Sequence, residues 1–192
     1  EKIKGLTEIP IRRQLANEVI GISYGFFSPL EGFMNKADVD AVVRHMHLDD
    51  GTIWPIPILF DLSDEDIAKY GVERGLTVVL TYQGNPMALF EITDVFEYDK
   101  KAMCKSIFGT EEDKHPGCKR IYETADKFVG GKITLVNQPV INDPYGPYFL
   151  PPLKLRATIK SKGWSRTVAH QTRNVPHTGH EWLMKGAFFQ TY

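Results

Sequence analysis

The residues whose types and spacing could do chemistry gather near the end of the sequence, in the run VAHQTRNVPHTGHE. Its first part, Gln171–Asn174 (QTRN), is a tight group of hydrogen-bond donors around one guanidinium, which suits an oxyanion. We expect this loop to lead into the N-terminus of a helix, where unsatisfied backbone N–H groups and the helix dipole favour phosphate or sulfate. The sequence therefore predicts an anion site in this segment.

Two histidines, His177 and His180, follow the loop three residues apart, so a helix would place their side chains on neighbouring positions of one side. His180 also begins an apolar stripe along the predicted helix, so we expect the pair to face a cleft. Two imidazoles there can donate hydrogen bonds to phosphate oxygens as negative charge builds. Gly179, between them, would let a phosphate or base approach the backbone closely.

Plainer interpretations of the same residues stay open. A basic residue in a loop is usually a surface charge, and a histidine on an apolar face is usually a core residue. The H-x-x-H spacing also occurs in metal sites, but zinc needs three or four protein ligands and this segment offers two obvious ones. The zinc-protease patterns do not match, because Glu181 follows the second histidine. We predict no metal site.

Charge is distributed unevenly along the 192 residues, although the net charge is only −1. Residues 1–150 hold sixteen Lys and Arg against twenty-three Asp and Glu, whereas residues 151–192 hold seven against one. The last part of the chain is thus suited to meeting anions, although a solvated basic face explains the charge equally well.

Composition and terminal patterns favour a globular protein of the cytoplasm. The apolar content of 42% is ordinary for a soluble protein, and no run approaches the roughly eighteen apolar residues of a membrane span. The polar start EKIKGLTEIPIRR does not resemble a secretory signal. Cys104 and Cys118 are too far apart for a CxxC site, so we expect two free thiols, with a disulfide left open.

Residues 1–150 are predicted to form a strand-rich unit with a few short helices. Asp38–Leu48 has apolar residues at helical spacing, and Ser63 with Asp66 offers a helix cap. A turn at Gly84-Asn85-Pro86 predicts a hairpin between the strands on its two sides. The predicted strands are Pro55–Leu62, Leu76–Tyr82, Ala88–Val95 and Ile133–Val136.

The region Asn142–Pro152 carries four prolines and a glycine, which predicts a linker between domains. After it we expect a helix over Leu153–Lys162, a strand over Ser165–His170 and a helix over His177–Tyr192. A strand, a turn and a helix in this order are the first elements of a nucleotide-binding α/β fold, but one such unit cannot form a sheet alone. We therefore expect a truncated chain or a partner that supplies the rest.

The run QTRNVPHTGHE resembles the signature of the ATP sulfurylase (sulfate adenylyltransferase) family, in which a QTRN loop precedes an HxxH element. Further blocks resemble the same family in the same order, so the resemblance covers essentially the whole chain. These blocks are GFFSPLEGFM (Gly25–Met34), DGTIWPIPILFDLS (Asp50–Ser63), IFGTEEDKHPGC (Ile107–Cys118) and GWSRTVAHQTRN (Gly163–Asn174).

The resemblance implies a mixed α+β fold: a PUA-like β-barrel domain over residues 1–150, and over 151–192 the start of a Rossmann-like α/β nucleotidyltransferase domain. It implies transfer of AMP from MgATP to sulfate, giving adenosine 5′-phosphosulfate and pyrophosphate reversibly, with Mg²⁺ as the only cofactor. Gln171 and Arg173 would hold sulfate. The catalytic and ATP-binding residues would come from the same segment: Gln171, Thr172, Arg173, Asn174, His177 and His180.

That reaction agrees with the residue types. Sulfate has no proton to remove at neutral pH, so positioning two anions and neutralising their repulsion should dominate over general-base or covalent catalysis. The sequence departs from the family pattern at His170, where an apolar residue is expected, and at Val175-Pro176, which replaces Pro-Leu. A second nucleotide-binding loop of GRDHAG type and a cysteine-rich zinc site are absent, so we expect no turnover by this chain alone.

Two functions of other classes compete. PUA-like folds often bind RNA, but the acidic charge of residues 1–150 opposes contact with a polyanion, so we predict no nucleic-acid partner. Alternatively, the first domain positions the catalytic part and helps assembly. We expect a homo-oligomer at full length and no membrane partner.

Overall fold

The computed structural model describes residues 3–137 and 146–191. The chain divides into two compact units, Glu1–Phe149 and Leu150–Tyr192. Within the predicted linker Asn142–Pro152, residues 142–145 lie outside the described residues, and Gly146–Tyr148 form a 3-10 helix, η1.

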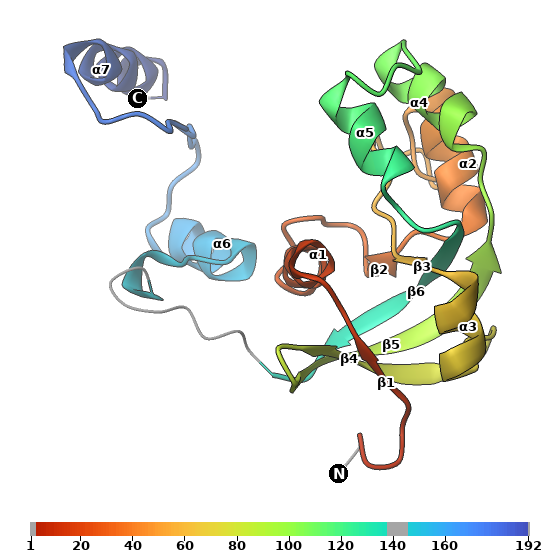
Figure 1. Cartoon of the computed structure of the whole chain (residues 1–192). Helices are drawn as coiled ribbons and strands as arrows, with labels where there is room; N and C mark the ends of the chain where they lie inside the picture. The colour runs from red at the N-terminus through yellow and green to blue at the C-terminus, as the bar shows by residue number, and fades with distance from the viewer. Residues whose placement is uncertain (1–2, 138–145, 192) are drawn as a thin grey trace. The chain divides into compact units, whose positions relative to one another are not determined.

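Unit 1 is built on one sheet in the order β1-β4-β5-β6-β2 (Figure 1). β1 runs parallel to β4, and the other pairs are antiparallel. β3 pairs with the start of β6, at Lys127 and Phe128, and β2 pairs with its middle, at Gly131 and Lys132. The strands are β1 (Glu8–Pro10), β2 (Gly32–Phe33), β3 (Asp61–Leu62), β4 (Thr77–Tyr82), β5 (Asn85–Phe96) and β6 (Lys127–Leu135).

The predicted hairpin is confirmed in β4 and β5. Gln83 and Gly84 form its turn, both with positive φ (51° and 76°), as the tight turns that match strand twist require. Asn85 and Pro86, predicted as turn residues, instead begin β5, where Asn85 pairs with Tyr82. The turn is therefore shorter than the sequence pattern indicates.

Close backbone contact explains the glycines of β6. A Cβ on Gly131 would lie 2.1 Å from the carbonyl oxygen of Glu91, and one on Gly32 would lie 1.8 Å from the carbonyl oxygen of Gly131. The register between β5 and β6 also shifts between Ile92 and Asp94, opposite these glycines. A bulge beside side-chain-free positions bends the sheet here.

Helix α2 overlaps the segment predicted to be helical, Asp38–Leu48, but runs from Lys36 to His45, and α3 begins at the predicted cap. α2 is capped by Asn35, whose side chain accepts a hydrogen bond from Asp38 N–H, and ends at Met46 in the left-handed conformation. In α3, Ser63 Oγ accepts from Asp66 N–H and donates to the Asp66 carboxylate, so the predicted cap is confirmed. The helices of unit 1 are α1 (Arg13–Ser23), α2 (Lys36–His45), α3 (Asp64–Tyr70), α4 (Lys100–Phe108) and α5 (Pro116–Tyr122).

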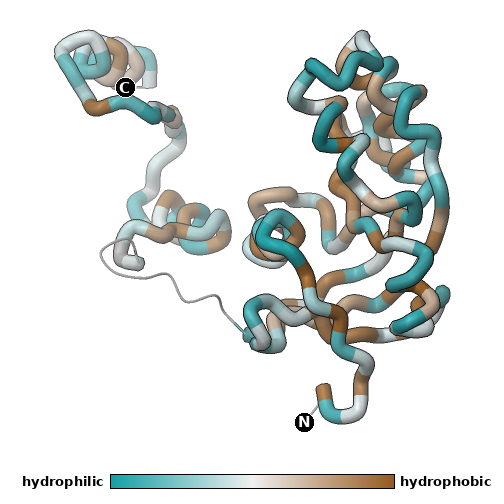
Figure 2. The backbone as a smooth tube through the Cα atoms, in the orientation of Figure 1, coloured by the Kyte–Doolittle hydropathy of each residue, from teal (hydrophilic) through white to brown (hydrophobic). Residues whose placement is uncertain are grey.

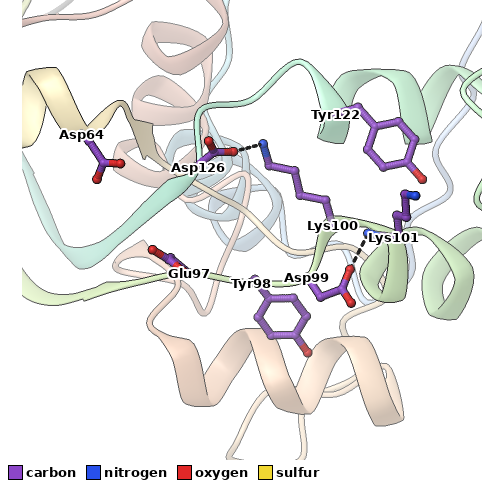
Figure 3. A pocket seen from close by; sticks show the side chains of 8 residues that line it. All are labelled: Asp64, Glu97, Tyr98, Asp99, Lys100, Lys101, Tyr122 and Asp126. Atoms are coloured by element: carbon purple, nitrogen blue, oxygen red, sulfur yellow. Dashed lines mark hydrogen bonds and ion pairs between the residues drawn. The ribbon is translucent and has the colours of Figure 1, made fainter.

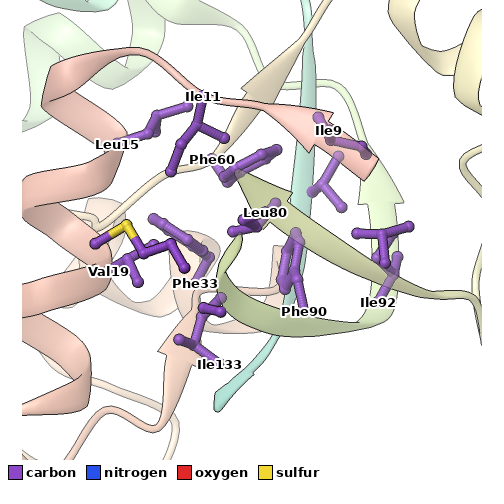
Figure 4. Close-up of a cluster of buried hydrophobic side chains, with 14 of the residues drawn as sticks. Ile9, Ile11, Leu15, Val19, Phe33, Phe60, Leu80, Phe90, Ile92 and Ile133 are labelled. Atoms are coloured by element: carbon purple, nitrogen blue, oxygen red, sulfur yellow. The ribbon is translucent and has the colours of Figure 1, made fainter. Parts of the chain in front are cut away.

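Two hydrophobic clusters hold unit 1 together. The first packs α1 against the sheet, with Phe33, Phe60 and Phe90 in mutual ring contact at 5.0–5.7 Å (Figure 4). The second joins α2, α4 and α5, which gather at one end of the sheet in Figure 1. Cys104 and Cys118 are buried there as free thiols, which confirms the expectation of unbridged cysteines.

The predicted strand Pro55–Leu62 is mostly wrong, because only Asp61–Leu62 pair, as β3. Pro55 and Pro57 lack the N–H groups that a ladder needs. The strand predicted at Ile133–Val136 is confirmed but begins earlier, at Lys127, because Phe128 and Val129 are also buried. The chain is thus a mixed α+β protein.

Unit 2 consists of α6 (Pro152–Ser161) and α7 (Thr178–Thr191), joined by a long loop. Both helices match their predictions to within two residues of the described chain. The strand predicted over Ser165–His170 is wrong: these residues are exposed and, within the described part of the unit, meet no strand to pair with. Neither helix buries a residue.

Candidate functional site

The candidate site lies in the loop before α7 and in its first turn. Residues 171–179 are exposed and His180 is half-buried. The structure brings four of the six predicted residues into one hydrogen-bonded group, formed by Thr172, Asn174, His177 and His180. It does not bond Gln171 or Arg173 to that group.

Thr172 is the centre of the group. Its Oγ1 accepts a hydrogen bond from Asn174 N–H at 3.1 Å and lies 3.4 Å from the Asn174 carbonyl oxygen, to which it donates. The same Oγ1 lies 3.2 Å from Nε2 of His180. One hydroxyl thus folds the loop back onto itself and ties it to the helix eight residues later.

Hydrogen bonds from the backbone orient both imidazoles. Nδ1 of His180 accepts from His177 N–H at 3.2 Å, and Nδ1 of His177 accepts from Gly179 N–H at 3.1 Å. Since a neutral imidazole has one N–H, we assign that proton to Nε2 in each ring. His180 then donates to Thr172, whereas Nε2–H of His177 has no acceptor among the described residues.

His177 acts as the cap of α7, because its side chain satisfies the N–H of Gly179 in the first turn. The backbone of Glu181 and of His180 then donates to the His177 carbonyl. A Cβ on Gly179 would lie 2.9 Å from Cε1 of His177. Glycine at this position leaves room for the capping ring, which a side chain would crowd. The sequence alone suggested a different reason, namely that Gly179 lets a ligand approach the backbone.

Three histidine rings meet at this helix start. The His177 and His180 rings have centroids 4.1 Å apart, and His170 lies edge-on to His180 at 5.9 Å. His170, which sequence analysis treated only as a departure from a pattern, is therefore a neighbour of the site. Among the described residues, no group of three or more His, Cys, Asp or Glu has a geometry that could hold a metal ion.

Arg173 is an uncompensated cation. From residue 151 onward the sequence holds a single acid, Glu181, and its carboxylate pairs with Lys185 at 2.6 Å. The Arg173 guanidinium has no ion pair or hydrogen bond with any described residue, and the same is true of the Gln171 amide. These donors stand beside an ordered loop and can meet an external anion without first breaking an internal bond.

The apolar residues of α7 are exposed instead of lining a cleft in the described unit. Leu183, Met184 and Trp182 are 65%, 45% and 73% exposed. In Figure 2 the tube of this helix carries brown apolar segments among teal ones. The prediction that the histidine pair faces a cleft stays a prediction.

Family models match both parts of the chain. Residues 1–138 match the PUA-like domain, and residues 146–191 match ATP-sulfurylase. Among the described residues, no helix has the length and apolar character needed to cross a membrane.

Curated relatives align with nearly the whole chain. The sulfate adenylyltransferase of Archaeoglobus fulgidus is 40% identical over 190 residues, which cover 92% of this chain and 41% of that protein. Those of Pyrococcus abyssi and Aeropyrum pernix are 36% and 38% identical, and each alignment covers 94% of this chain and 46% of the relative. The chain thus spans somewhat less than half the length of these relatives.

A solved structure has a similar fold. The hexameric APS kinase from Thiobacillus denitrificans matches with a TM-score of 0.72 at 23% identity, over 98% of this chain and 33% of that one. At this identity the likeness supports the chain's fold alone.

Proposed function

We propose that this chain, which belongs to the PUA-like domain family, is the first part of a sulfate adenylyltransferase and carries the anion-binding half of its active site. The single observation that supports this best is the loop at residues 171–180, where an unpaired Arg173 stands beside a hydrogen-bonded group of Thr172, Asn174 and two histidines. The match of residues 146–191 to the ATP-sulfurylase family model, and the similarity of the chain to named sulfate adenylyltransferases, agree with it.

In the proposed reaction, a sulfate oxygen bonds to the α-phosphorus of ATP while the bond from that phosphorus to the bridging oxygen of pyrophosphate breaks. The products are adenosine 5′-phosphosulfate and pyrophosphate, and no proton is transferred. Two anions must therefore be held in line against their repulsion. The abundance of donors and the lack of an unpaired carboxylate in the described part of unit 2 suit that task.

Arg173 and Gln171 are the groups we assign to sulfate. A guanidinium binds an oxyanion with two parallel hydrogen bonds, and the Gln171 amide adds a neutral donor. Thr172, Arg173 and Asn174 would border the α-phosphate. The internal bonds of Thr172 hold this loop in shape before the substrate arrives, so that less ordering remains to be done on binding.

His177 and His180 are assigned to the phosphates of ATP. Nε2–H of His177 is already oriented by the cap bond to Gly179 and lacks an acceptor among the described residues, so it can donate to a phosphate oxygen. A hydrogen bond to Thr172 holds the His180 ring beside the same loop. The start of α7 adds backbone N–H groups and the positive end of its dipole.

Mg²⁺ enters this proposal as part of the substrate MgATP. Mg²⁺ prefers oxygen ligands and is commonly bound through phosphates and a few carboxylates. The one carboxylate of residues 151–192, Glu181, is engaged by Lys185. The residues of this chain therefore suit an ion brought by ATP and do not form a protein cage for it.

Several finer points belong to the same proposal. We infer that residues 1–150 form a domain whose sheet curls toward a β-barrel, helped by the bulge and glycines of β5 and β6. We infer that residues 151–192 begin a Rossmann-like catalytic domain. A cytoplasmic location and a homo-oligomeric whole protein remain predictions.

The direct test is pyrophosphate release from MgATP by the natural-length protein, measured with and without sulfate. We expect release to depend on sulfate and to stop when sulfate is omitted. Release at the same rate without sulfate would mean hydrolysis of ATP and would overturn the proposal. Adenosine 5′-phosphosulfate should accumulate in equal amount to pyrophosphate.

A further inference from the structure

A pocket of unit 1 has the features of a ligand site and lies outside the residues assigned to sulfate and ATP. Its volume is about 370 Å³, within the usual range for small-molecule sites. It is bounded by the start of α1, the loop that precedes β3, and α5. Its polar lining residues include Arg12, Glu18, Asp61, His115 and Arg120.

One pair of charges in the wall is already satisfied. Arg12 forms an ion pair with Asp61, and the second carboxylate oxygen of Asp61 accepts from Ala125 N–H at 2.8 Å. The Asp61 side chain is only 4% exposed. This pair is a fixed part of the pocket and leaves no net charge there.

Two other charges have no such partner. Glu18 and Arg120 both line the pocket, yet neither forms an ion pair or a side-chain hydrogen bond with a described residue. Burial raises the pKa of the Glu18 carboxyl, as expected for a carboxylate that loses water without gaining a partner. The pocket therefore presents one unpaired acid and one unpaired guanidinium.

A second pocket of unit 1 differs from the first in how many of its charged side chains have partners. That pocket, about 560 Å³ in volume, is also lined by charged residues, but most of their side chains pair with another charged side chain or with the backbone (Figure 3). Lys100 bonds to Asp126 at 2.9 Å, and Asp99 caps α4 through Lys101 N–H. Glu97 pairs with Lys127. Among its charged lining residues, Lys101 alone has no side-chain partner in the described part of the chain, so this pocket does not combine an unpaired acid with an unpaired cation.

The remaining wall of the smaller pocket is mostly apolar. Pro57 and Ile121 are buried, and the rings of Phe108 and His115 stack with centroids 4.7 Å apart at 33°. Nδ1 of His115 accepts from Gly117 N–H at 3.2 Å, so its neutral ring carries the proton on Nε2 and offers a donor. An apolar or aromatic body with charged ends fits such a lining.

We propose that this pocket binds a small zwitterion whose ammonium group is received by Glu18 and whose carboxylate is received by Arg120, with its apolar body against Phe108 and Ile121. The proposal is independent of the sulfate chemistry. The N-terminal ammonium of a peptide could also bind Glu18, but a peptide has no carboxylate next to that ammonium. Comparing ligands that carry one charge with ligands that carry both therefore distinguishes a peptide from a small zwitterion.

The experiment titrates the 192-residue chain with four probes and follows backbone amide shifts at Gly117 and Thr124. L-phenylalanine and 4-(aminomethyl)benzoate carry both charges at different separations, and benzylamine and benzoate carry one each. We expect at least one zwitterion to shift these amides and to bind roughly tenfold or more tightly than either single-charge probe. No shift up to about 10 mM, or equal binding of benzylamine, would overturn the proposal.

Variants assign the two charges. Glu18→Gln should weaken the bound zwitterion roughly tenfold and leave benzoate unchanged, whereas Arg120→Gln should weaken the zwitterion and leave benzylamine unchanged. Lys119→Gln, which removes a neighbouring cation outside the pocket, is the control and should bind like the parent chain. Unweakened binding by Glu18→Gln would contradict the assigned ammonium site. When each substitution is made in the natural-length protein, sulfate-dependent pyrophosphate release should persist.

Discussion

The two units of this chain differ in what holds them in shape. In unit 1, two hydrophobic clusters bury large side chains from the sheet and from helices distant in sequence. In unit 2, α6 and α7 bury no residue, and the bonds that shape the candidate site join residues at most eight positions apart. Local capping and turn chemistry can therefore define the loop at 171–180 without a core beneath it.

This difference bears on function. A loop with few tertiary contacts can present Arg173 and Gln171 to a ligand, while the internal bonds of Thr172 limit how far the loop can rearrange. The pocket of unit 1, in contrast, includes the buried residues Pro57, Asp61 and Ile121 in its wall. Substitutions in the two units should accordingly affect different quantities.

Gly131→Ala should have the largest effect on stability. Its Cβ would lie 2.1 Å from the Glu91 carbonyl oxygen, and the backbone on both sides belongs to paired strands that cannot move apart freely. We expect unit 1 to lose about 3 kcal/mol of its free energy of unfolding. Hydrogen exchange of the β5 and β6 amides measures this. Unchanged protection would contradict the close backbone contact.

Thr172→Val should leave unit 1 unchanged and weaken catalysis. The substitution keeps the shape of the side chain but removes the oxygen that bonds Asn174 and His180. We expect roughly tenfold slower pyrophosphate release by the natural-length protein, since two hydrogen bonds to Asn174 and one to His180 are lost. Thr167→Val, in the exposed loop before the site, is the matched control. Equal loss in both variants would count against Thr172 as the centre of the group.

Gly186→Ala makes in unit 2 the same substitution that Gly131→Ala makes in unit 1, but we expect it to raise stability instead of lowering it. Gly186 lies inside α7, and apart from its chain neighbours and the nearby backbone of the helix itself, no described atom lies within 4 Å of where a Cβ would be. Because alanine favours helix more than glycine, we expect α7 to gain about 1 kcal/mol. Far-UV circular dichroism of the chain should report more helix. Reduced helix content would show that the surroundings of Gly186 are not open.

Glu18→Gln should have the smallest effect on stability, and its size depends on pH. Because the folded pKa of Glu18 is raised, the neutral carboxyl favours folding below the unfolded pKa of about 4.3, and that contribution is lost as pH rises through the folded pKa. Glutamine stays neutral at every pH. We expect the variant to be about 0.5 kcal/mol more stable at neutral pH, a modest value because water still screens this half-buried group.

Urea unfolding at neutral and acidic pH checks this prediction. The difference between Glu18→Gln and the parent chain should disappear near pH 3, where both side chains are neutral. A difference that persists there would mean that shape or packing, and not charge, accounts for it.

Features encoded within a few residues were predictable from sequence. The Ser63 cap of α3, the hairpin of β4 and β5 and the bounds of α6 and α7 all follow from local spacing and turn chemistry. The resemblance to ATP sulfurylases was confirmed by the family models and the relatives. The residue roles that it implied stay predictions.

Features that depend on distant partners were not predictable. Ser165–His170 has the composition of a strand, but a strand also needs a neighbour, which the described residues of unit 2 do not supply. The contact of His170 with His180, and the approach of Gly131 to Glu91, arise only once the backbone is folded. The unpaired state of Glu18 likewise requires knowing which cations lie near it.

The most direct measurement of the central claim compares Arg173→Ala with Arg166→Ala in the natural-length protein, by sulfate-dependent pyrophosphate release. Both variants remove one exposed guanidinium from the same loop region, but only Arg173 belongs to the proposed site. We expect release to fall about a hundredfold or more for Arg173→Ala and to change little for Arg166→Ala. Unchanged release by Arg173→Ala, or an equal fall in both, would contradict the claim that residues 171–180 bind the reacting anions.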